Sequence, residues 1–401
     1  MNTITGSPAT SNATVTATPA CARAISCMLV ATLLLGAGGC MQKMDPAQAR
    51  AEFSSKNRSI ANAQAATAPA PTLPPLGSGP VELGAPSVGS GAQAREREAS
   101  ELARQQLNDA QSLLRAAARS SWAALRAHAI EAAASNAALL AELAPAGLAD
   151  ENRGVRFVTC MAIAANPTKD LEVLVQPLVA DESESVRASA LLALSRCGKT
   201  VDPSPIAGMA FSNDPEVRAN AYLVLGEMRN RSAVPLIYDS LTKGLELVNP
   251  VRVRLIGLAA SEALVKLGEA REIEPIRAAL FAPPEQSEIT VVACGAIGRL
   301  KDEVARPMLE RLLTVSGDGR RSPEIRLSAA TALMELGGNP KLAVAVAQEY
   351  LTNGDARVRA VVAVLLGKAR CPEATTILTN LIRDTDPTVQ VAAAAGLEAI
   401  E

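Results

Sequence analysis

Apolar positions between residues 95 and 401 follow a repeated helical pattern. An apolar anchor residue is followed by further apolar residues, mostly Ala and Leu, four, seven and eight positions later, on one face of a helix. Nine copies at intervals of 30 to 36 residues predict an array of repeats. The anchors are Leu125, Val155, Val186, Val217, Val253, Ile289, Ile325, Val358 and Val389.

Most copies also carry the signals of a helix start. Residues that cap free backbone N–H groups lie three positions before six anchors, and Pro follows three of them. A second amphipathic stretch separates consecutive copies, so each unit is predicted to be a helical hairpin, and residues 95–119 to be the first helix of the first repeat. Because a lone hairpin cannot bury its apolar face, we expect an all-α fold, a right-handed α-solenoid of about nine stacked hairpins. The capping residues are Asn152, Ser183, Asp214, Ser322, Asp355 and Asp386.

The array over 95–401 resembles the HEAT-repeat family, specifically the short bacterial type also seen in phycobilin lyases. The resemblance implies a curved scaffold whose inner surface is lined by the second helices and binds partners. This chain departs from the pattern at Thr290 and Gln390, which replace the Arg that follows the anchor in the other copies, and the fifth copy carries extra residues.

A different pattern precedes the array. An apolar run over 25–37 follows Arg23 and ends in Gly38, Gly39 and Cys40, which resembles a bacterial lipoprotein signal, although Ala37 stands where Leu is usual. This predicts a signal peptide over 1–39, a lipid on Cys40, and anchoring in the cell envelope, at the outer membrane facing the periplasm. An ordinary cleaved signal and an uncleaved anchor are the alternatives. Residues 40–94, rich in Ala, Pro, Gly and Ser, are predicted to be a disordered tether.

The amino-acid composition argues against several classes of function. The chain has one His, 2% aromatic residues and a net charge of −2. A His-rich metal site is thereby excluded, and a nucleic-acid binder would need a basic footprint and stacking side chains. We expect no metal, no cofactor, no nucleic-acid partner and no enzymatic activity.

An Arg follows the anchor residue in seven of the nine copies. These arginines, one per repeat, would form either an anion-binding strip or a set of structural contacts to the neighbouring turns. We favour the structural role, since isolated surface charges rarely mark sites. This Arg column comprises Arg126, Arg156, Arg187, Arg218, Arg254, Arg326 and Arg359.

A catalytic pair of His128 and Cys160 would need a third, orienting residue, and the sequence shows none. We therefore interpret His128 as a helix-surface residue and the thiols as small apolar residues without disulfides. These thiols are Cys160, Cys197, Cys294 and Cys371.

Three loops lengthen the fifth to seventh repeats, at 242–249, 281–287 and 314–321. Insertions in solenoids gather on one edge and often bind ligands, but neutral drift in length explains them equally well. The sequence thus predicts a non-catalytic, lipid-anchored envelope scaffold that binds a protein partner on its concave face or on these loops. The alternatives are a HEAT-like lyase or chaperone-type protein acting on a protein-bound chromophore, and a subunit of a larger envelope complex.

Overall fold

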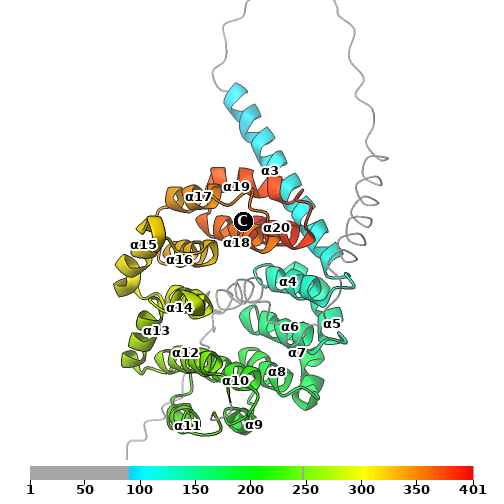
Figure 1. The fold of residues 1–401 in the computed structure, drawn as a ribbon. Helices are drawn as coiled ribbons and strands as arrows, with labels where there is room; N and C mark the ends of the chain where they lie inside the picture. Colours follow the sequence, from blue (N-terminus) through cyan, green and yellow to red (C-terminus); the bar gives the residue numbers. More distant parts are fainter. Residues whose placement is uncertain (1–89, 246–247, 401) are drawn as a thin grey trace, which may run out of the picture.

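The computed structural model describes residues 90–245 and 248–400, and every regular element there is a helix (Figure 1). The all-α prediction is confirmed. The predicted signal peptide over 1–39, Cys40 and the tether as far as residue 89 lie outside the described residues. The first described helix begins at Ser90, five residues before the predicted start of the array.

The nine predicted anchor segments form long helices on the inner side of the molecule (Figure 1). Their capping signals act as predicted at Asn152, Asp214 and Asp355, whose side chains accept hydrogen bonds from backbone N–H groups of the first turn. The inner helices are α4 (Ala123–Ala133), α6 (Arg153–Ala165), α8 (Glu184–Arg196), α10 (Pro215–Met228), α12 (Pro250–Lys266), α14 (Ser287–Leu300), α16 (Pro323–Glu335), α18 (Ala356–Ala369) and α20 (Pro387–Ile400).

Nine further α-helices of the described chain lie on the outside of this set (Figure 1). They are α3 (Ser90–Ala117), α5 (Ala137–Leu148), α7 (Lys169–Val175), α9 (Ser204–Met209), α11 (Val234–Ser240), α13 (Ile273–Ala279), α15 (Arg306–Thr314), α17 (Pro340–Gln348) and α19 (Pro372–Leu381). Short 3-10 helices also occur, at Gln176–Ala180, Arg231–Ala233, Ala270–Glu272, Pro284–Gln286, Glu303–Ala305 and Gly317–Gly319.

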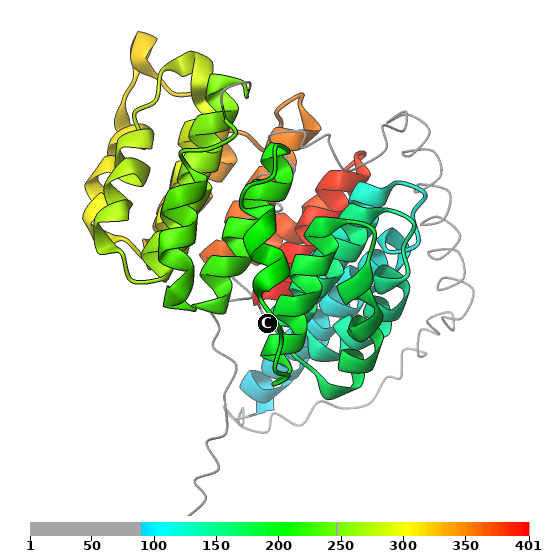
Figure 2. The same cartoon turned by 90° about the horizontal axis from the view of Figure 1, so that it is seen from below.

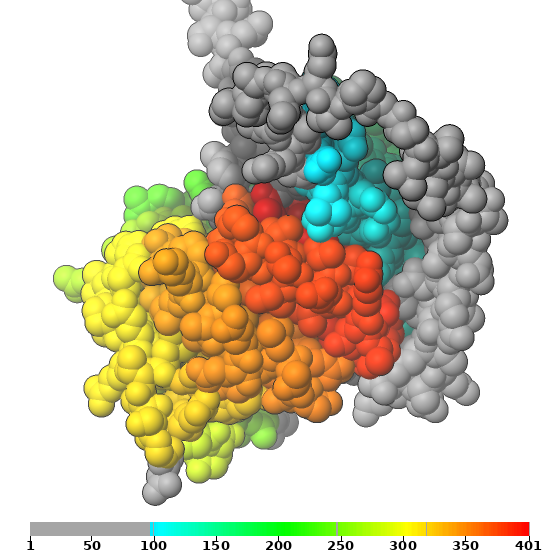
Figure 3. Space-filling view, turned by 90° about the horizontal axis from the view of Figure 1, so that it is seen from above, coloured from blue at the N-terminus to red at the C-terminus, as the bar shows by residue number. Residues whose placement is uncertain are grey.

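The inner helices close into a ring. Each one contacts the next from α4 to α20, and α20 in turn contacts α4 (Figures 1 and 2). Helix α3 packs against both α20 and α4, so it covers the seam as α19 covers the junction of α18 and α20. Figure 3 shows the C-terminal helices directly beside the N-terminal one. The first described helix therefore completes the last repeat as well as the first.

Polar contacts tie the seam together. The carboxylate of Glu398 on α20 is buried, and its Oε1 accepts hydrogen bonds from Asn136 Nδ2 at 2.6 Å and from Gln111 Nε2 at 3.4 Å. These contacts join residues that are 262 and 287 positions apart. The ring is thus held by side chains from both ends of the described chain.

Small residues let the inner helices approach closely. A Cβ atom on Gly367 of α18 would lie 2.7 Å from the Cα of Gly396 on α20, and one on Gly226 of α10 would lie 2.9 Å from the Cα of Ala263 on α12. Such contacts are closer than side chains permit, so these helices pack backbone against backbone.

The fifth repeat has a different register from the predicted one. Val253 is only half-buried, whereas Ile256 is 2% exposed and is followed by buried residues at the offsets seen in other repeats, including Leu258 and Ala260. Helix α12 begins early, at Pro250, and its true anchor is Ile256. The residue after that anchor is Gly257, so the fifth repeat contributes no Arg to the Arg column.

Among the described residues, no helix combines the length and the apolar character that crossing a membrane requires.

Candidate functional site

The Arg column forms clamps between consecutive repeats. Arg156 on α6 donates from Nε and Nη2 to both carboxylate oxygens of Asp181, at 2.8 and 3.0 Å, and from Nη1 to the backbone oxygen of Asp150 at 2.9 Å. Asp150 and Asp181 each lie five positions before an anchor, so one guanidinium joins the loops before two successive inner helices. Arg126 with Asp150 and Arg359 with Asp384 repeat this geometry.

These clamps are largely buried. The side chains of Arg156 and Asp181 are 11% and 10% exposed. Hydrogen bonds to the aspartates raise the pKa of Arg126, Arg156 and Arg359, even though burial alone would lower it. Both groups of each pair are satisfied by their neighbours, which leaves no free cation for a ligand.

Three further arginines of the Arg column are also occupied, by other partners. Arg187 donates to the backbone oxygens of Asp181 and Glu182 and pairs with Glu184 at 3.5 Å. Arg218 is fully buried; it donates to the backbone oxygens of Ser212, Ser240 and Lys243 and leaves Nη2 without a hydrogen bond in the described chain. Arg326 donates to the Tyr350 hydroxyl, to Glu349 and to the Leu313 oxygen.

Arg254 does not belong to the Arg column, contrary to the sequence prediction. It is exposed and donates to Gln286, because the register of α12 places Gly257 at the column position. In the next repeat that position is Thr290, which is buried and donates to the Ala279 oxygen at 3.3 Å. The fifth and sixth repeats therefore lack the clamp.

His128 and the thiols form no catalytic constellation in the described residues. His128 is buried rather than on the surface, and its Nδ1 lies 3.7 Å from the Glu131 carboxylate. Cys160 and Cys294 are fully buried free thiols, and burial raises the pKa of each to about 12. Cys197 and Cys371 are also free, and burial raises the pKa of Cys197. Thiols held in this protonated state are poor nucleophiles.

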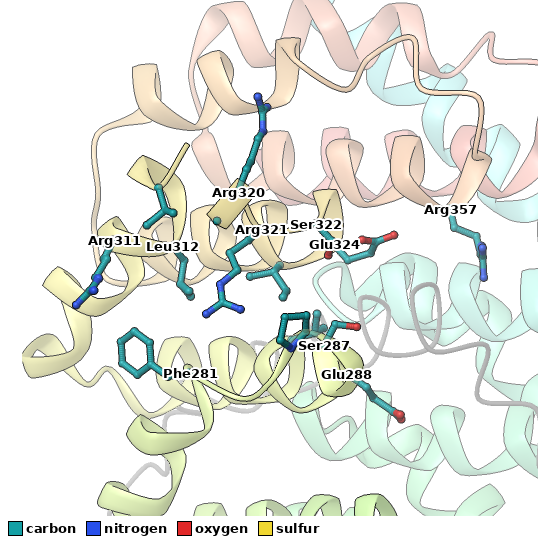
Figure 4. A pocket seen from close by; sticks show the side chains of 15 residues that line it. Phe281, Ser287, Glu288, Arg311, Leu312, Arg320, Arg321, Ser322, Glu324 and Arg357 are labelled. Atoms are coloured by element: carbon teal, nitrogen blue, oxygen red, sulfur yellow. The ribbon is translucent and has the colours of Figure 1, made fainter. Parts of the chain in front are cut away.

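A cleft of about 870 Å³ occupies the place of the missing clamp in the sixth repeat (Figure 4). Both Pro284 and Arg320 line it, and these residues lie five positions before the anchors Ile289 and Ile325. In the regular repeats an Arg links the loops at these two positions. With Thr290 in its place, the two loops are not bridged and the space between them is open.

Two of the three predicted insertion loops meet at this cleft. Its lining includes Phe281, Pro284 and Ser287 from the loop over 281–287, and Val315 and Arg320 from the loop over 314–321. The loop over 242–249 does not line it, and residues 246–247 lie outside the described chain. A volume of this size is within the ordinary range of ligand sites.

The cleft combines an apolar surface with cations. Phe281 is 43% exposed, while Leu312 and Val291 are buried beneath the surface. The side chains of Arg311 and Arg321 line the cleft without a hydrogen bond or ion pair to any described residue, whereas Arg320 pairs with Glu349 and Arg357 with Asp355. In Figure 4 the Arg321 side chain extends toward the side where Phe281 and Ser287 lie, and Arg320 extends the opposite way.

The carboxylates that line the cleft already have cations nearby. Glu288 pairs with Arg252 at 2.9 Å. The pKa of Arg357 is raised mainly by its hydrogen bond to Asp355 and to a smaller degree by the charge of Glu324. Glu324 forms no ion pair with any described residue, and Arg311 and Arg321 together outweigh it, so the cleft carries an excess of positive charge.

A second set of charges, which we call the charge network, joins the opposite ends of the inner helices. Lys266 pairs with Glu227 and Glu262 at 2.8 Å each, Arg299 pairs with Glu262 at 2.6 Å, and Arg196 pairs with Glu227 at 3.3 Å. Farther along, Glu335 pairs with Lys368 at 2.6 Å and Lys301 at 3.0 Å. The members are Arg196, Glu227, Glu262, Lys266, Arg299, Lys301, Glu335 and Lys368.

Sequence reasoning missed the charge network, although a signal for it exists. With Ile256 as the fifth anchor, six of its members stand ten positions after an anchor, at Arg196, Glu227, Lys266, Arg299, Glu335 and Lys368. A carboxylate at the C-terminal end of a helix is unfavourable, so Glu227 and Glu335 need the cations of neighbouring helices. Burial would raise the pKa of Glu262, but the charges of Arg299 and Lys266 outweigh it and lower the pKa.

No group of three or more His, Cys, Asp or Glu side chains in the described part of the chain is arranged to hold a metal ion. Neither a protein-family model nor any of the curated proteins searched matches this sequence.

Proposed function

We propose that this protein is a non-catalytic scaffold of HEAT-like repeats that binds a protein partner at the cleft between its sixth and seventh repeats. The observation that carries the proposal is the pair of unpaired arginines, Arg311 and Arg321, beside the exposed ring of Phe281. Aromatic residues and Arg are enriched where proteins bind one another.

Two surfaces were expected to bind a partner, the concave face and the loops of the fifth to seventh repeats. We favour the loops because the six arginines of the Arg column that lie in register are occupied by aspartates, backbone oxygens or other side chains, while Arg311 and Arg321 in the cleft have no hydrogen bond or ion pair to any described residue. A binding role is also supported by the protonated, buried thiols, which are unsuited to nucleophilic chemistry.

The proposed location is the cell envelope, with the array held at the outer membrane by lipid on Cys40. This part rests on the sequence of residues 25–40. Each buried CH₂ contributes about 0.8 kcal/mol, so several acyl chains anchor a protein firmly where one does not. The stretch over 41–89 would then separate the ring from the membrane.

The test is purification of the tagged full-length protein from native membranes in mild detergent, with mass spectrometry of the intact protein and of what accompanies it. We expect a chain that begins at Cys40 with acyl mass, and one stoichiometric protein partner. The variant Arg311→Glu/Arg321→Glu should lose the partner, while Arg383→Glu, a charge reversal at an exposed arginine in another repeat, should keep it. Retention of the partner by the cleft variant would contradict the proposed site, and an unacylated full-length chain would contradict the anchor.

A further inference from the structure

The structure assigns a chemical class to the partner segment: we infer that the cleft binds an acidic peptide with an apolar side chain between two carboxylates. This inference rests on the proposed function and specifies what its site recognises. It starts from the order of groups along the cleft, where an apolar surface separates two cations.

The two cations belong to different elements. Arg311 lies on α15, and Arg321 lies in the loop before α16. In the view of Figure 4, Phe281 and Leu312 lie between the two guanidinium groups. Positive charge is thus divided between two places, and each guanidinium presents a fork of donors that fits a carboxylate. Two carboxylates spaced along a chain match this arrangement better than a single compact anion does.

The apolar part of the segment fits the surface between the cations. Phe281 is 43% exposed in a chain that has only four Phe, and Val291, Leu312 and Val315 continue the apolar lining next to it. An apolar side chain placed there would cover the ring and exclude water from the flanking ion pairs, which strengthens them.

The cleft is open at its edges, which favours a chain that enters and leaves over an enclosed small molecule. Pro284, Gly319 and Arg320 on its rim are all exposed.

The test uses labelled peptides and full-length protein in mild detergent, measured by fluorescence anisotropy. The probe contains Glu-Leu-Glu between Gly-Ser linkers; one analogue replaces both Glu by Gln, and another replaces Leu by Ala. We expect each analogue to bind about tenfold more weakly, since each loses interactions of the size that changes affinity by that factor. The double variant Arg311→Gln/Arg321→Gln should bind the Glu and Gln peptides equally, and the control Arg383→Gln should keep the preference.

Equal binding of the Glu and Gln peptides by the unmodified protein would overturn the inference, as would a preference that survives in the double variant. Displacement of the probe by inorganic phosphate at lower concentration than by unlabelled peptide would also overturn it, in favour of a compact anion. If the peptides fail while partner capture still depends on Arg311 and Arg321, the inference fails and the proposed function stands. If capture is insensitive to both arginines, the proposed site fails as well.

Discussion

Two arcs of the ring hold their helices together in different ways. In the regular arc, from α4 to α8 and from α18 to α20, clamps of Arg and Asp join the loops before successive inner helices. In the inserted arc, from α10 to α16, the fifth and sixth repeats have Gly257 and Thr290 at the clamp position, and the charge network joins the opposite ends of the helices instead. The comparison teaches that in the fifth and sixth repeats the stabilising contacts lie at one edge of the ring, and that the cleft lies at the other edge.

The first two repeats show the converse, because they have the clamp and lack the charge network. Ten positions after their anchors stand Ser135 and Ala165, which carry no charge, and the ninth repeat has Ala399 there. Arg359 with Lys368 marks the eighth repeat, where both devices occur, at one border of the inserted arc. An edge freed from structural contacts is the edge on which loops can grow and side chains can remain unpaired.

The largest effect on stability should come from Glu262→Ala in the inserted arc. The change leaves Arg299 and Lys266, 17% and 14% exposed, without the carboxylate between them. Removing one partner of a buried ion pair costs about 3–5 kcal/mol, so urea denaturation should show a loss of that size. A loss below about 1 kcal/mol, as at exposed pairs, would contradict the role of the charge network.

A smaller loss is expected from Arg156→Ala in the regular arc. It removes two hydrogen bonds to Asp181 and leaves that carboxylate largely buried. Hydrogen bonds to charged groups contribute about 1.5–3 kcal/mol, and we expect a decrease of about 2–3 kcal/mol in the free energy of unfolding. Arg187→Ala is the matched control, because Arg187 makes no hydrogen bond or ion pair to an aspartate of the following loop, so its loss should cost less. Equal losses would show that the clamp depends on the backbone contacts alone.

The pH dependence of stability tests whether the carboxylates of the charge network stabilise the fold in their ionised state. The folded pKa values of Glu262 and Glu335 are lowered by neighbouring cations, although burial opposes this. Their stabilising contribution is therefore complete above the unfolded pKa of about 4.3 and is lost as pH falls toward the folded values. In Glu262→Gln, denaturation midpoints measured between pH 6 and pH 3 should fall less than in the unmodified protein. An identical fall would exclude Glu262 as a source of acid lability.

The smallest effect on stability is expected from substitutions at the proposed site. Arg311→Ala and Arg321→Ala remove no hydrogen bond or ion pair within the described chain, so each should change the free energy of unfolding by less than about 0.5 kcal/mol. Thermal and urea denaturation of these variants beside Arg156→Ala measures the contrast between the two arcs directly. A loss above about 1 kcal/mol would indicate a structural role for these arginines.

The helical part of the fold could be predicted because the apolar period recurs in every repeat, and in most repeats a capping residue such as Asn152 or Asp214 marks the helix start. The closure of the ring could not, since it depends on Glu398 meeting Asn136 and Gln111, and no local pattern relates residues so far apart. The error at Val253 has a similar origin. Positions three apart share a helix face, so period alone does not separate Val253 from Ile256.

Only part of the site could be predicted from the sequence. The longer period located the loops over 281–287 and 314–321, and Thr290 was visible as a departure from the Arg column. What makes the cleft a site is that Arg311 and Arg321 lack partners among the described residues, and pairing is a property of three-dimensional neighbours. The charge network was hidden by the wrong fifth anchor, which placed Lys266 thirteen positions after it instead of ten.

The central claim is that the inserted arc binds the partner and the regular arc holds the ring together. It is tested most directly by hydrogen–deuterium exchange of the full-length protein with and without its captured partner. The account predicts that binding slows exchange in 281–287 and 314–322 and leaves the clamp loops around 150–156 and 181–187 unchanged. Slower exchange in those clamp loops, with none at the cleft, would contradict it.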